Sequence, residues 1–411
     1  MIACTPSVAP GSSGVRCAPV VLRLALALTL SLPPQVASGA DRTPDRKSPE
    51  RPAGSEHTCA VTVAGGVRCW GANASGQVGD GTNVNRSVPV NVAGLAEGVT
   101  VIALGAEHTC ALTSGGAMGC WGANFSGQLG DGTNVNRNAP VGVSRLGGGV
   151  TAIAAGSEHT CAVVGGGVRC WGSNASGQLG DGSGVRHSTP VSVSGMSGGV
   201  AAIAAGSEHA CALTTGGAVW CWGANFSGQL GDGTNVSRGT PVNVSGLAGG
   251  VVEIAAGSEH TCALTTGGAI ACWGANFSGQ LGDGTHANRN APVGVYGLAA
   301  GATEIAAGAE HACAVVAGGV KCWGTNASGQ LGDGTRVNRS APVDVAGLSA
   351  AVDAIAAGSA HTCALTTGGA MACWGANYSG QLGDGSNASR ATPVSVPGLP
   401  SVRPSVRWRI L

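Results

Sequence analysis

The chain has 411 residues, and its 21 basic and 21 acidic side chains give a formal net charge of zero. A neutral chain has no general attraction to nucleic acid or to anionic membranes, so nucleic acid is not expected as a partner. Aromatic residues are only 3% and glycines number 73, so any core must be built largely from small side chains. With 43% hydrophobic residues the composition nevertheless excludes a disordered chain.

The first 40 residues have the layout of a secretory signal peptide. Arg16 and Arg23 come before or at the start of an apolar run at 24–32, and small residues at 38–40 end the segment before Asp41. The apolar run is too short to span a bilayer, and no other segment is apolar enough to do so. We therefore predict a signal peptide at 1–40, a polar, proline-rich linker at 41–52, and a secreted, periplasmic or cell-surface protein. An uncleaved leader is the alternative.

A single phrase, His-Thr-Cys-Ala-Leu … Cys-Trp-Gly … Gly-Gln-Leu-Gly-Asp-Gly, recurs seven times with small variations at intervals of 50 or 51 residues. A fixed period of this length is typical of solenoids and propellers. The repeats fill residues 53–399 and begin near residues 54, 105, 156, 206, 257, 308 and 358.

Each repeat predicts four short strands. In the fourth copy these are 200–205, 209–214, 218–223 and 241–244, with a loop rich in Gly, Asn, Asp and Ser at 225–238. Four strands in about 50 residues make one propeller blade. The sequence therefore predicts an all-β fold, a seven-bladed β-propeller.

Two cysteines in each repeat lie opposite each other across the turn between the second and third strands. They are ten residues apart in five copies, which fits a three-residue turn, and nine apart in two copies, which fits a two-residue turn with glycine. Both lengths keep the cysteines in register, close enough for a disulfide. The predicted bridges are Cys59–Cys69, Cys110–Cys120, Cys161–Cys170, Cys211–Cys221, Cys262–Cys272, Cys313–Cys322 and Cys363–Cys373. Such bridges indicate an oxidising compartment.

The same register places a tryptophan of the third strand opposite a small residue of the second, as Trp222 faces Ala210. Stacked blades can fill each other's hollows in this way. The recurring tryptophans are therefore assigned structural roles: Trp70, Trp121, Trp171, Trp222, Trp273, Trp323 and Trp374. So are the histidines that begin each second strand: His57, His108, His159, His209, His260, His311 and His361.

The first blade has no recognisable first strand before Gly54. The C-terminal tail, 400–411, is the expected source of the missing strand, because Val406, Trp408 and Ile410 alternate there. It does not match the Ile-Ala-Ala pattern of the other first strands, and Pro404 interrupts it.

The phrases Gly-Ser-Glu-His-Thr-Cys-Ala-Leu and Cys-Trp-Gly-Ala-Asn-x-Ser-Gly-Gln-Leu-Gly-Asp-Gly resemble the regulator of chromosome condensation repeat family over about 350 residues. The cysteine pairs are similar to those of exported bacterial members. The family implies a seven-bladed propeller, but its members have different functions: a nuclear exchange factor for a small GTPase, a plant photoreceptor, and secreted inhibitors of β-lactamases. A fold so widely reused does not determine function.

Three kinds of chemistry are suggested by the repeats but lack part of their usual residue pattern. Zinc needs four ligands, whereas each repeat supplies one His and two Cys without a Cys-x-x-Cys knuckle. The Asp-Gly-Thr-Asn-Val-Asn stretch at 80–85 alternates oxygen side chains but lacks the order and the distal Glu of a calcium loop, so turn chemistry is the favoured interpretation and calcium stays open. The adjacent Glu56 and His57 point to opposite faces of a strand and cannot easily form an acid–base pair. No catalytic, cofactor or metal site is expected, and the chain is not expected to be an enzyme.

Positions that differ among the copies are the best candidates for a function. The residue after the repeated Asn is aromatic in four copies, and the loop after Asp-Gly carries a cation in every copy. Equivalent loops of a propeller emerge on one face, and aromatic residues and Arg are common in binding hot spots. The candidate binding residues are Phe125, Phe226, Phe277, Tyr378, Arg86, Arg137, Arg238, Arg289, Arg339 and Arg390, with His187 in the equivalent place of the third copy. In the alternative interpretation, the aromatics cover blade edges and each Arg pairs with a loop Asp.

Asn-x-Ser occurs in every copy, as at Asn73 and Asn124. In a eukaryotic secretory host these would be glycan acceptors, whereas in a bacterium they are turn residues only, which is the favoured interpretation.

The leading hypothesis is an exported, monomeric, non-catalytic propeller that binds a protein or other macromolecule through loops on one face. The alternatives are an exchange factor for a small GTPase, supported by the family resemblance only, and a secreted enzyme inhibitor.

Overall fold

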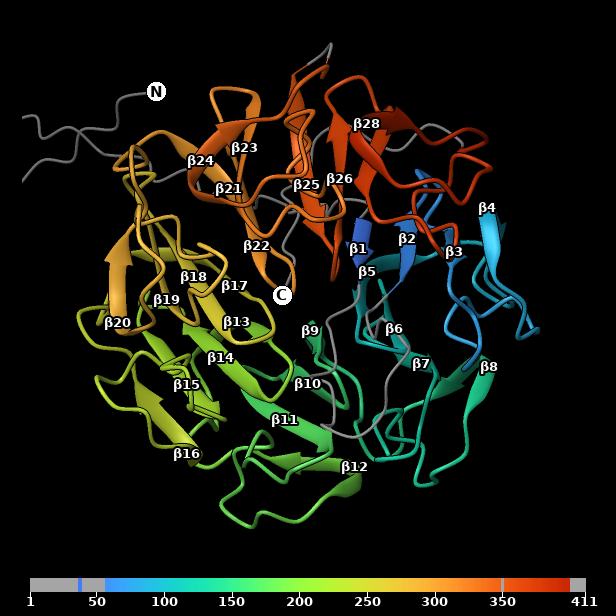
Figure 1. Ribbon diagram of the computed structural model, residues 1–411. Coiled ribbons are helices and arrows are strands. Elements are labelled where there is room, and N and C mark those ends of the chain that lie inside the picture. Colours follow the sequence, from blue (N-terminus) through green and yellow to red (C-terminus); the bar gives the residue numbers. More distant parts are fainter. Residues whose placement is uncertain (1–35, 39–55, 349–350, 400–411) are drawn as a thin grey trace, which may run out of the picture. The chain divides into compact units, whose positions relative to one another are not determined.

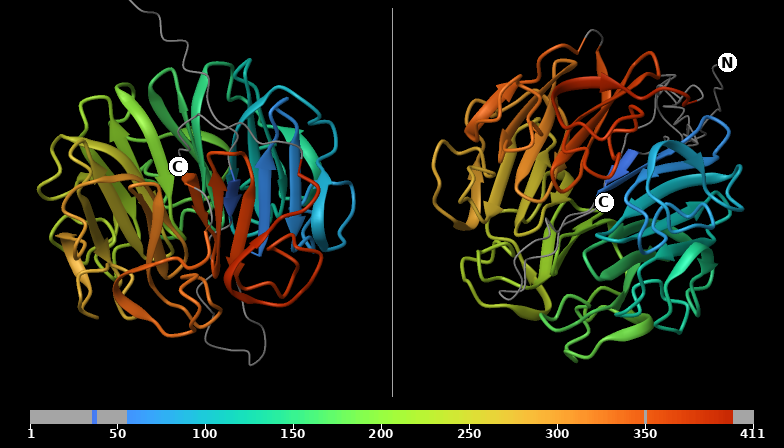
Figure 2. Two further views of the ribbon diagram at one scale, coloured as in Figure 1. Left: turned by 90° about the horizontal axis from the view of Figure 1, so that it is seen from above. Right: turned by 45° about the vertical axis from the view of Figure 1, so that its right-hand side comes forward.

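The computed structural model describes residues 36–38, 56–348 and 351–399, all of which belong to one compact unit. In this unit seven four-stranded antiparallel sheets stand side by side around a central axis, which makes a seven-bladed β-propeller as the repeats predict (Figures 1 and 2). No helix long and apolar enough to cross a membrane occurs in the described ranges.

The four strands of each blade follow one another in sequence, from the axis outward. The innermost strands are β1 (Val36–Ser38), β5 (Val99–Leu104), β9 (Val150–Ala155), β13 (Val200–Ala205), β17 (Val251–Ala256), β21 (Ala302–Ala307) and β25 (Val352–Ala357). The second strands are β2 (His57–Val61), β6 (His108–Thr113), β10 (His159–Val164), β14 (His209–Thr214), β18 (His260–Thr265), β22 (His311–Val316) and β26 (His361–Thr366).

The third strands are β3 (Val67–Gly71), β7 (Met118–Gly122), β11 (Gly167–Gly172), β15 (Val219–Gly223), β19 (Ile270–Gly274), β23 (Gly319–Gly324) and β27 (Met371–Gly375). The outer strands are β4 (Arg86–Asn91), β8 (Arg137–Gly142), β12 (His187–Ser192), β16 (Arg238–Asn243), β20 (Arg289–Gly294), β24 (Arg339–Asp344) and β28 (Arg390–Ser395). The outer strand β16 differs from the prediction: it begins at Arg238 rather than at residue 241, because Arg238 already pairs with Gly223 across a bulge.

The turns between the second and third strands have the lengths that the cysteine spacing predicts. In blade 4, Cys211 pairs with Cys221 and Ala210 with Trp222, and Gly217 takes the positive φ of 80° in the three-residue turn. In blade 3, both residues of the two-residue turn, Gly165 and Gly166, have positive φ. A disulfide joins the two cysteines of every blade, in the seven pairs that the register predicts. Each bridge closes a small loop and stabilises the fold by roughly 2.5–3 kcal/mol in a chain-entropy estimate.

The structure differs from the sequence-based expectation at the first strand of blade 1. Residues Val36–Ser38 form β1, which pairs antiparallel with β2 and places Ala37 opposite Cys59. β1 also contacts β5 on one side and β25 on the other, so the ring of inner strands is continuous. The segment 36–38 lies within the predicted signal peptide. The C-terminal tail that was expected to supply this strand lies outside the described residues.

Tryptophan and histidine fasten each blade to the next one. Trp121 of blade 2 is fully buried against Val61 and Val67 of blade 1, and its indole Nε1 donates to the backbone carbonyl of Gln77, 2.9 Å away. All seven tryptophans make the equivalent bond across a blade interface. A Cβ on Gly79 would lie 2.5 Å from the Trp121 ring, which explains the glycine after Gln-Leu or Gln-Val in every copy.

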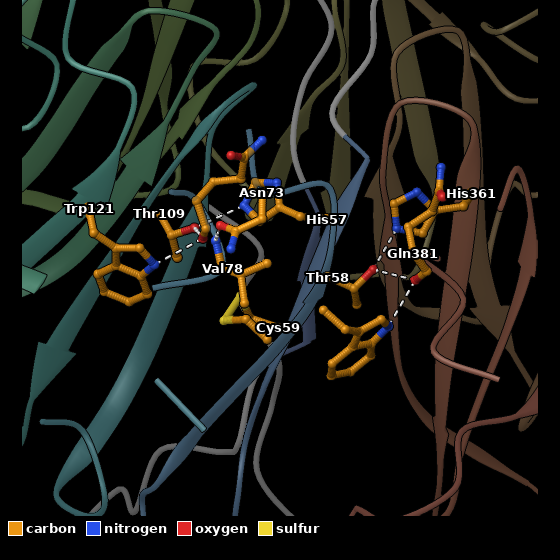
Figure 3. Close-up of a disulfide and its surroundings, with 12 residues drawn as sticks. His57, Thr58, Cys59, Asn73, Val78, Thr109, Trp121, His361 and Gln381 are labelled. Atoms are coloured by element: carbon orange, nitrogen blue, oxygen red, sulfur yellow. Dashed lines mark hydrogen bonds between the residues drawn. A yellow bond between two sulfur atoms is a disulfide. The ribbon is translucent and has the colours of Figure 1, made fainter. Parts of the chain in front are cut away.

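The histidine side chains complete this interface (Figure 3). His57 is fully buried, and its Nε2 lies 2.9 Å from the Thr109 hydroxyl of the next blade. Thr109 gives its only hydroxyl proton to the Gln77 carbonyl, so His57 Nε2 must be the donor to Thr109, and Nδ1 carries no proton. Five interfaces have this chain of bonds, and the one between blades 7 and 1 is made by His361, Thr58 and Gln381.

Two interfaces lack the threonine, since Ala210 and Ala312 stand in its place. We expect Ala210→Thr and Ala312→Thr each to raise the free energy of unfolding by about 1 kcal/mol. Each new hydroxyl would bond the Gln178 or Gln280 carbonyl and accept from the buried imidazole of His159 or His260. The check is the urea midpoint of the double variant, with Thr109→Ala as the matched reverse change, which should lower it. An unchanged midpoint in both would show that these bonds add nothing.

Candidate functional site

One end of the propeller carries two connections from every blade, and this end is called the loop face. It consists of the short connections between first and second strands, such as 206–208, and the long connections between third and outer strands, such as 224–237. The opposite end carries the tight turns between second and third strands and the segments that lead to the next blade. The loop face is therefore where the copies can vary without disturbing the sheets.

A buried asparagine organises each long loop. Asn225 is fully buried, and its Nδ2 donates to Asp232 Oδ1 and to the carbonyls of Thr234 and Val236, while its Oδ1 accepts from the Leu230 amide. The equivalent asparagines are equally enclosed, at 0 or 1% exposure: Asn73, Asn124, Asn174, Asn276, Asn326 and Asn377. The Asn-x-Ser triplets are thus the hubs of the loops.

The cations of the long loops are bound within their own loops. Arg137 lies 2.9 Å from Asp131, and each of the six predicted arginines pairs with the aspartate six residues before it. His187 approaches Asp181 in the same way. Burial alone would raise the pKa of Asp131, but hydrogen bonds from Thr133 and Arg137 outweigh it and hold the pKa below its ordinary value. The sequence allows two interpretations of these arginines, and the structure shows the second, in which each arginine pairs with an aspartate of its own loop. The arginines therefore stabilise the loops, and their charges are balanced by the aspartates.

The aspartate contacts also bear on the calcium interpretation of residues 80–85. Asp80 accepts hydrogen bonds from Asn73 Nδ2, from the Thr82 amide and hydroxyl, and from Arg86. Cationic and amide donors therefore occupy the carboxylate that a calcium ion would need. In the described ranges no three His, Cys, Asp or Glu side chains lie close enough to hold a metal ion.

The four aromatic residues of the long loops project into solvent. Phe125 is 60% exposed, Phe226 76%, Phe277 74% and Tyr378 58%. An asparagine side chain fixes the backbone of three of them, at the carbonyls of Phe125, Phe226 and Tyr378, whereas His286 takes the place of this asparagine in the loop of Phe277. Exposed apolar side chains on rigid loops are typical of a binding surface.

Sequence reasoning missed two groups of exposed apolar residues. A valine follows the Asp-Gly turn in five long loops and is 57–59% exposed: Val84, Val135, Val185, Val236 and Val337. Its repetition in the sequence was the signal that could have found it. Tyr296 is 71% exposed but lies in the segment after β20, at the opposite end.

Each long loop is joined to the outer strand of the next blade around the whole ring. The Gly132 amide donates to the Ser188 carbonyl of the next blade, and the Gly385 amide of blade 7 donates to Ser87 of blade 1. Nearer the axis, the serine of one long loop donates to the glutamate of the next blade, as Ser227 does to Glu259 at 2.7 Å. Six interfaces have this serine–glutamate bond, and Ala360 replaces the glutamate at the seventh. His260, next to Glu259, is buried in the blade interface. In such a Glu-His pair the glutamate thus bonds a neighbouring loop and the histidine packs between blades, so both residues have structural roles.

The fold and its loop face define a disulfide-linked seven-bladed propeller with one varied surface. Residues 96–410 match the family model of the RCC1-like domain, and residues 64–112 match that of the regulator of chromosome condensation (RCC1) repeat. The chain therefore belongs to the RCC1-like family.

Similar proteins include the ultraviolet-B receptor UVR8 of Arabidopsis thaliana, 31% identical over 58% of this chain and 56% of the receptor. The human E3 ubiquitin-protein ligase HERC2 is 34% identical over 64% of this chain but only 4% of the ligase. The chain thus covers about half, or far less, of these relatives. Among solved structures, human WBSCR16 has a TM-score of 0.73 at 24% identity, covering 82% of this chain and 95% of that one. Prp20p of Saccharomyces cerevisiae, described with its binding to Gsp1p and histones, has a TM-score of 0.70 at 23% identity, covering 80% and 85%. These two likenesses are of fold.

Proposed function

We propose that this chain is an exported, non-catalytic propeller that binds another protein through its loop face and acts as a monomer. The observation that supports this most directly is the set of four exposed aromatic residues on the long loops, three of which have a backbone carbonyl fixed by an asparagine side chain. Preordered aromatic side chains lose little conformational entropy on binding and supply most of the energy of many protein interfaces.

Export is supported by the chemistry of the repeats. Seven disulfides persist only where thiols are oxidised, and the basic and apolar residues at 16–32, which precede β1, have the order of a secretory signal. The buried Asn-x-Ser triplets favour a host that does not glycosylate them, and hence a bacterial exterior or periplasm. A secreted enzyme inhibitor is a special case of this proposal. The exchange-factor alternative rests on family membership alone.

Site-specific photo-crosslinking in cells that export the chain tests the binding face. A benzophenone amino acid replaces Phe226 in one variant and Tyr296 in a matched control, because both residues are aromatic and more than 70% exposed but lie at opposite ends. We expect a discrete protein adduct from position 226 and none from position 296. Equal adducts from both positions, or none from position 226, would contradict the proposal.

A further inference from the structure

The inner strands of blades 2 to 7 share one residue pattern beside the disulfide. The residue that pairs with the first cysteine of each bridge is always alanine: Ala103, Ala154, Ala204, Ala255, Ala306 and Ala356. An isoleucine precedes every one of these alanines, and both residues are buried, with no more than 4% exposed. The pair Ile-Ala therefore marks an inner strand by its register position.

The strand β1 has a similar pattern in the same register. Its pairing with β2 places Ala37 opposite Cys59, and the residue before it is Val36, which is β-branched like isoleucine. A match of two residues is too short to be recognised without the register. The residue types of β1 thus agree with its place in the fold, as expected of a native inner strand of blade 1.

The neighbouring strand β2 depends on this partner. All five of its residues, His57–Val61, are buried, and buried backbone N–H and C=O groups must be paired. β3 pairs with one edge of β2, and β1 pairs with the other edge at residues 58–60. β1 also contacts β5 and β25, the inner strands of the two adjacent blades. Without β1, the ring would be open at its inner layer and buried backbone groups would lose their partners.

This role conflicts with removal of the whole predicted signal peptide. Cleavage after residue 40, which the small residues at 38–40 favour, would remove β1 from the exported chain. A second pair of small residues, Thr29 and Ser31, lies at the end of the apolar run and has the one-residue gap typical of a signal cleavage site. Cleavage at this second pair would leave β1 in place.

We propose that export removes only residues 1–31, so that the mature chain begins at Leu32 and keeps β1 as the strand that closes the ring. A signal peptidase would hydrolyse the peptide bond between Ser31 and Leu32. One water molecule gives its hydroxyl to the carbonyl carbon of Ser31 and its proton to the new amino group of Leu32. This inference rests on the export part of the proposed function, because only an exported chain loses a leader.

The N-terminus of the exported chain is the first test. The full chain with its own leader is expressed in a bacterium, and the exported form is analysed by intact mass and N-terminal sequencing. We expect a start at Leu32, and any start up to Val36 would also retain β1. A start beyond Ser38 in a protease-resistant chain would overturn the inference. A chain that stays in the cytoplasm with Met1 in place would refute export itself, and the truncations below then decide alone whether β1 is needed.

Two truncated chains behind a foreign periplasmic signal provide the second test. We expect the chain that starts at Asp41 to melt at least about 5 °C lower than the chain that starts at Leu32, because β2 has lost its partner. A matched control starts at Leu32 but lacks residues 42–50. It should melt normally, because blade 2 makes the equivalent connection with only the residues 105–107.

A synthetic peptide of residues 32–40 then distinguishes the strand from a mere loss of chain. Added to the chain that starts at Asp41, it should restore the melting temperature by completing the sheet. The same peptide with Ala37→Asp should not, since alanine stands opposite the cysteine in every blade. Equal melting temperatures of the two truncated chains, or equal rescue by both peptides, would refute the role of β1.

Discussion

Acidification from pH 7 to pH 5 is expected to unfold the propeller in a steep transition. The seven histidines at the blade interfaces are fully buried, and their Nδ1 atoms have no hydrogen-bond partner. Burial lowers the pKa of His57, His108, His209 and His311 to about 3, with help from neighbouring histidines. Burial likewise lowers the pKa of His159, His260 and His361 to about 4.

The direction follows from the protons bound by each state. Between pH 6.5 and about 4 an unfolded histidine is protonated while the folded one is neutral, so stability is complete above pH 6.5 and falls as the pH falls. At pH 5 each histidine lowers the free energy of unfolding by about 2 kcal/mol relative to its value at neutral pH, and the seven together lower it by about 14 kcal/mol. That sum is comparable to the whole stability of an ordinary domain, about 5–15 kcal/mol.

Other groups change this outcome little in that window. The loop aspartates have lowered pKa values, so their contribution is lost only below about pH 4. Glu304 opposes the trend, since burial and the nearby Glu253 raise its pKa and it is more stable protonated. Burial also raises the pKa of Glu56, and two carboxyls do not offset seven imidazoles.

Tryptophan fluorescence and near-ultraviolet circular dichroism against pH measure the transition, because every blade places one tryptophan in an interface. Urea titrations at several pH values give the slope of the unfolding free energy. His159→Gln should reduce this slope by about one seventh, whereas His286→Asn, at an exposed loop position, should leave it unchanged. A native spectrum at pH 5 would contradict this expectation.

Much of the fold could be predicted because the seven repeats of the chain can be aligned with one another. The cysteine spacing of nine or ten residues determined both turn types and all seven disulfide pairs, since register in a hairpin depends only on counting. The first strand of blade 1 could not be predicted in this way. β1 has three residues, too few for a hydrophobic period, and its backbone hydrogen bonds depend on no particular side chain.

On the loop face, too, some features could be predicted from the sequence and others could not. The exposed aromatics were identified where the copies differ, and the constant spacing of Asp80 and Arg86 was present in the sequence as a sign of local pairing. The bond from Ser75 to Glu107 spans 32 residues and two blades, so it depends on how blades pack rather than on any local pattern. These serine–glutamate bonds therefore became visible only after the blades were placed side by side.

Expression through a eukaryotic secretory pathway is expected to yield no native protein. That pathway attaches glycans to Asn-x-Ser in the newly made chain, which has twelve such triplets, and in seven of them, one in each repeat, the asparagine is buried. A glycan replaces a proton of Nδ2, the atom that in Asn124 donates to Asp131 and to the carbonyls of Thr133 and Val135. With one proton left on Nδ2 the modified side chain could not make all of these bonds, and its glycan could not enter the loop.

Each loop would lose about three buried hydrogen bonds and be forced open by a large polar group, at a cost of several kcal/mol per blade. The loss would not stay local, because Gly132 of the same loop bonds the next blade and closes the ring. Export into a bacterial periplasm should instead give a folded chain without free thiols among the fourteen repeat cysteines.

The decisive comparison uses three preparations of one chain: periplasmic, eukaryotic, and eukaryotic with glycan transfer blocked by tunicamycin. Secreted yield, glycan occupancy by mass spectrometry and resistance to protease are measured for each. We expect the blocked preparation to recover the protease-resistant fold of the periplasmic one, since both compartments form disulfides and only the glycans differ. A fully glycosylated chain that is protease-resistant would mean that the seven asparagines are not the buried hubs of the loops. It would also remove one of the two structural supports for a bacterial site of export, leaving the disulfides alone to indicate the compartment.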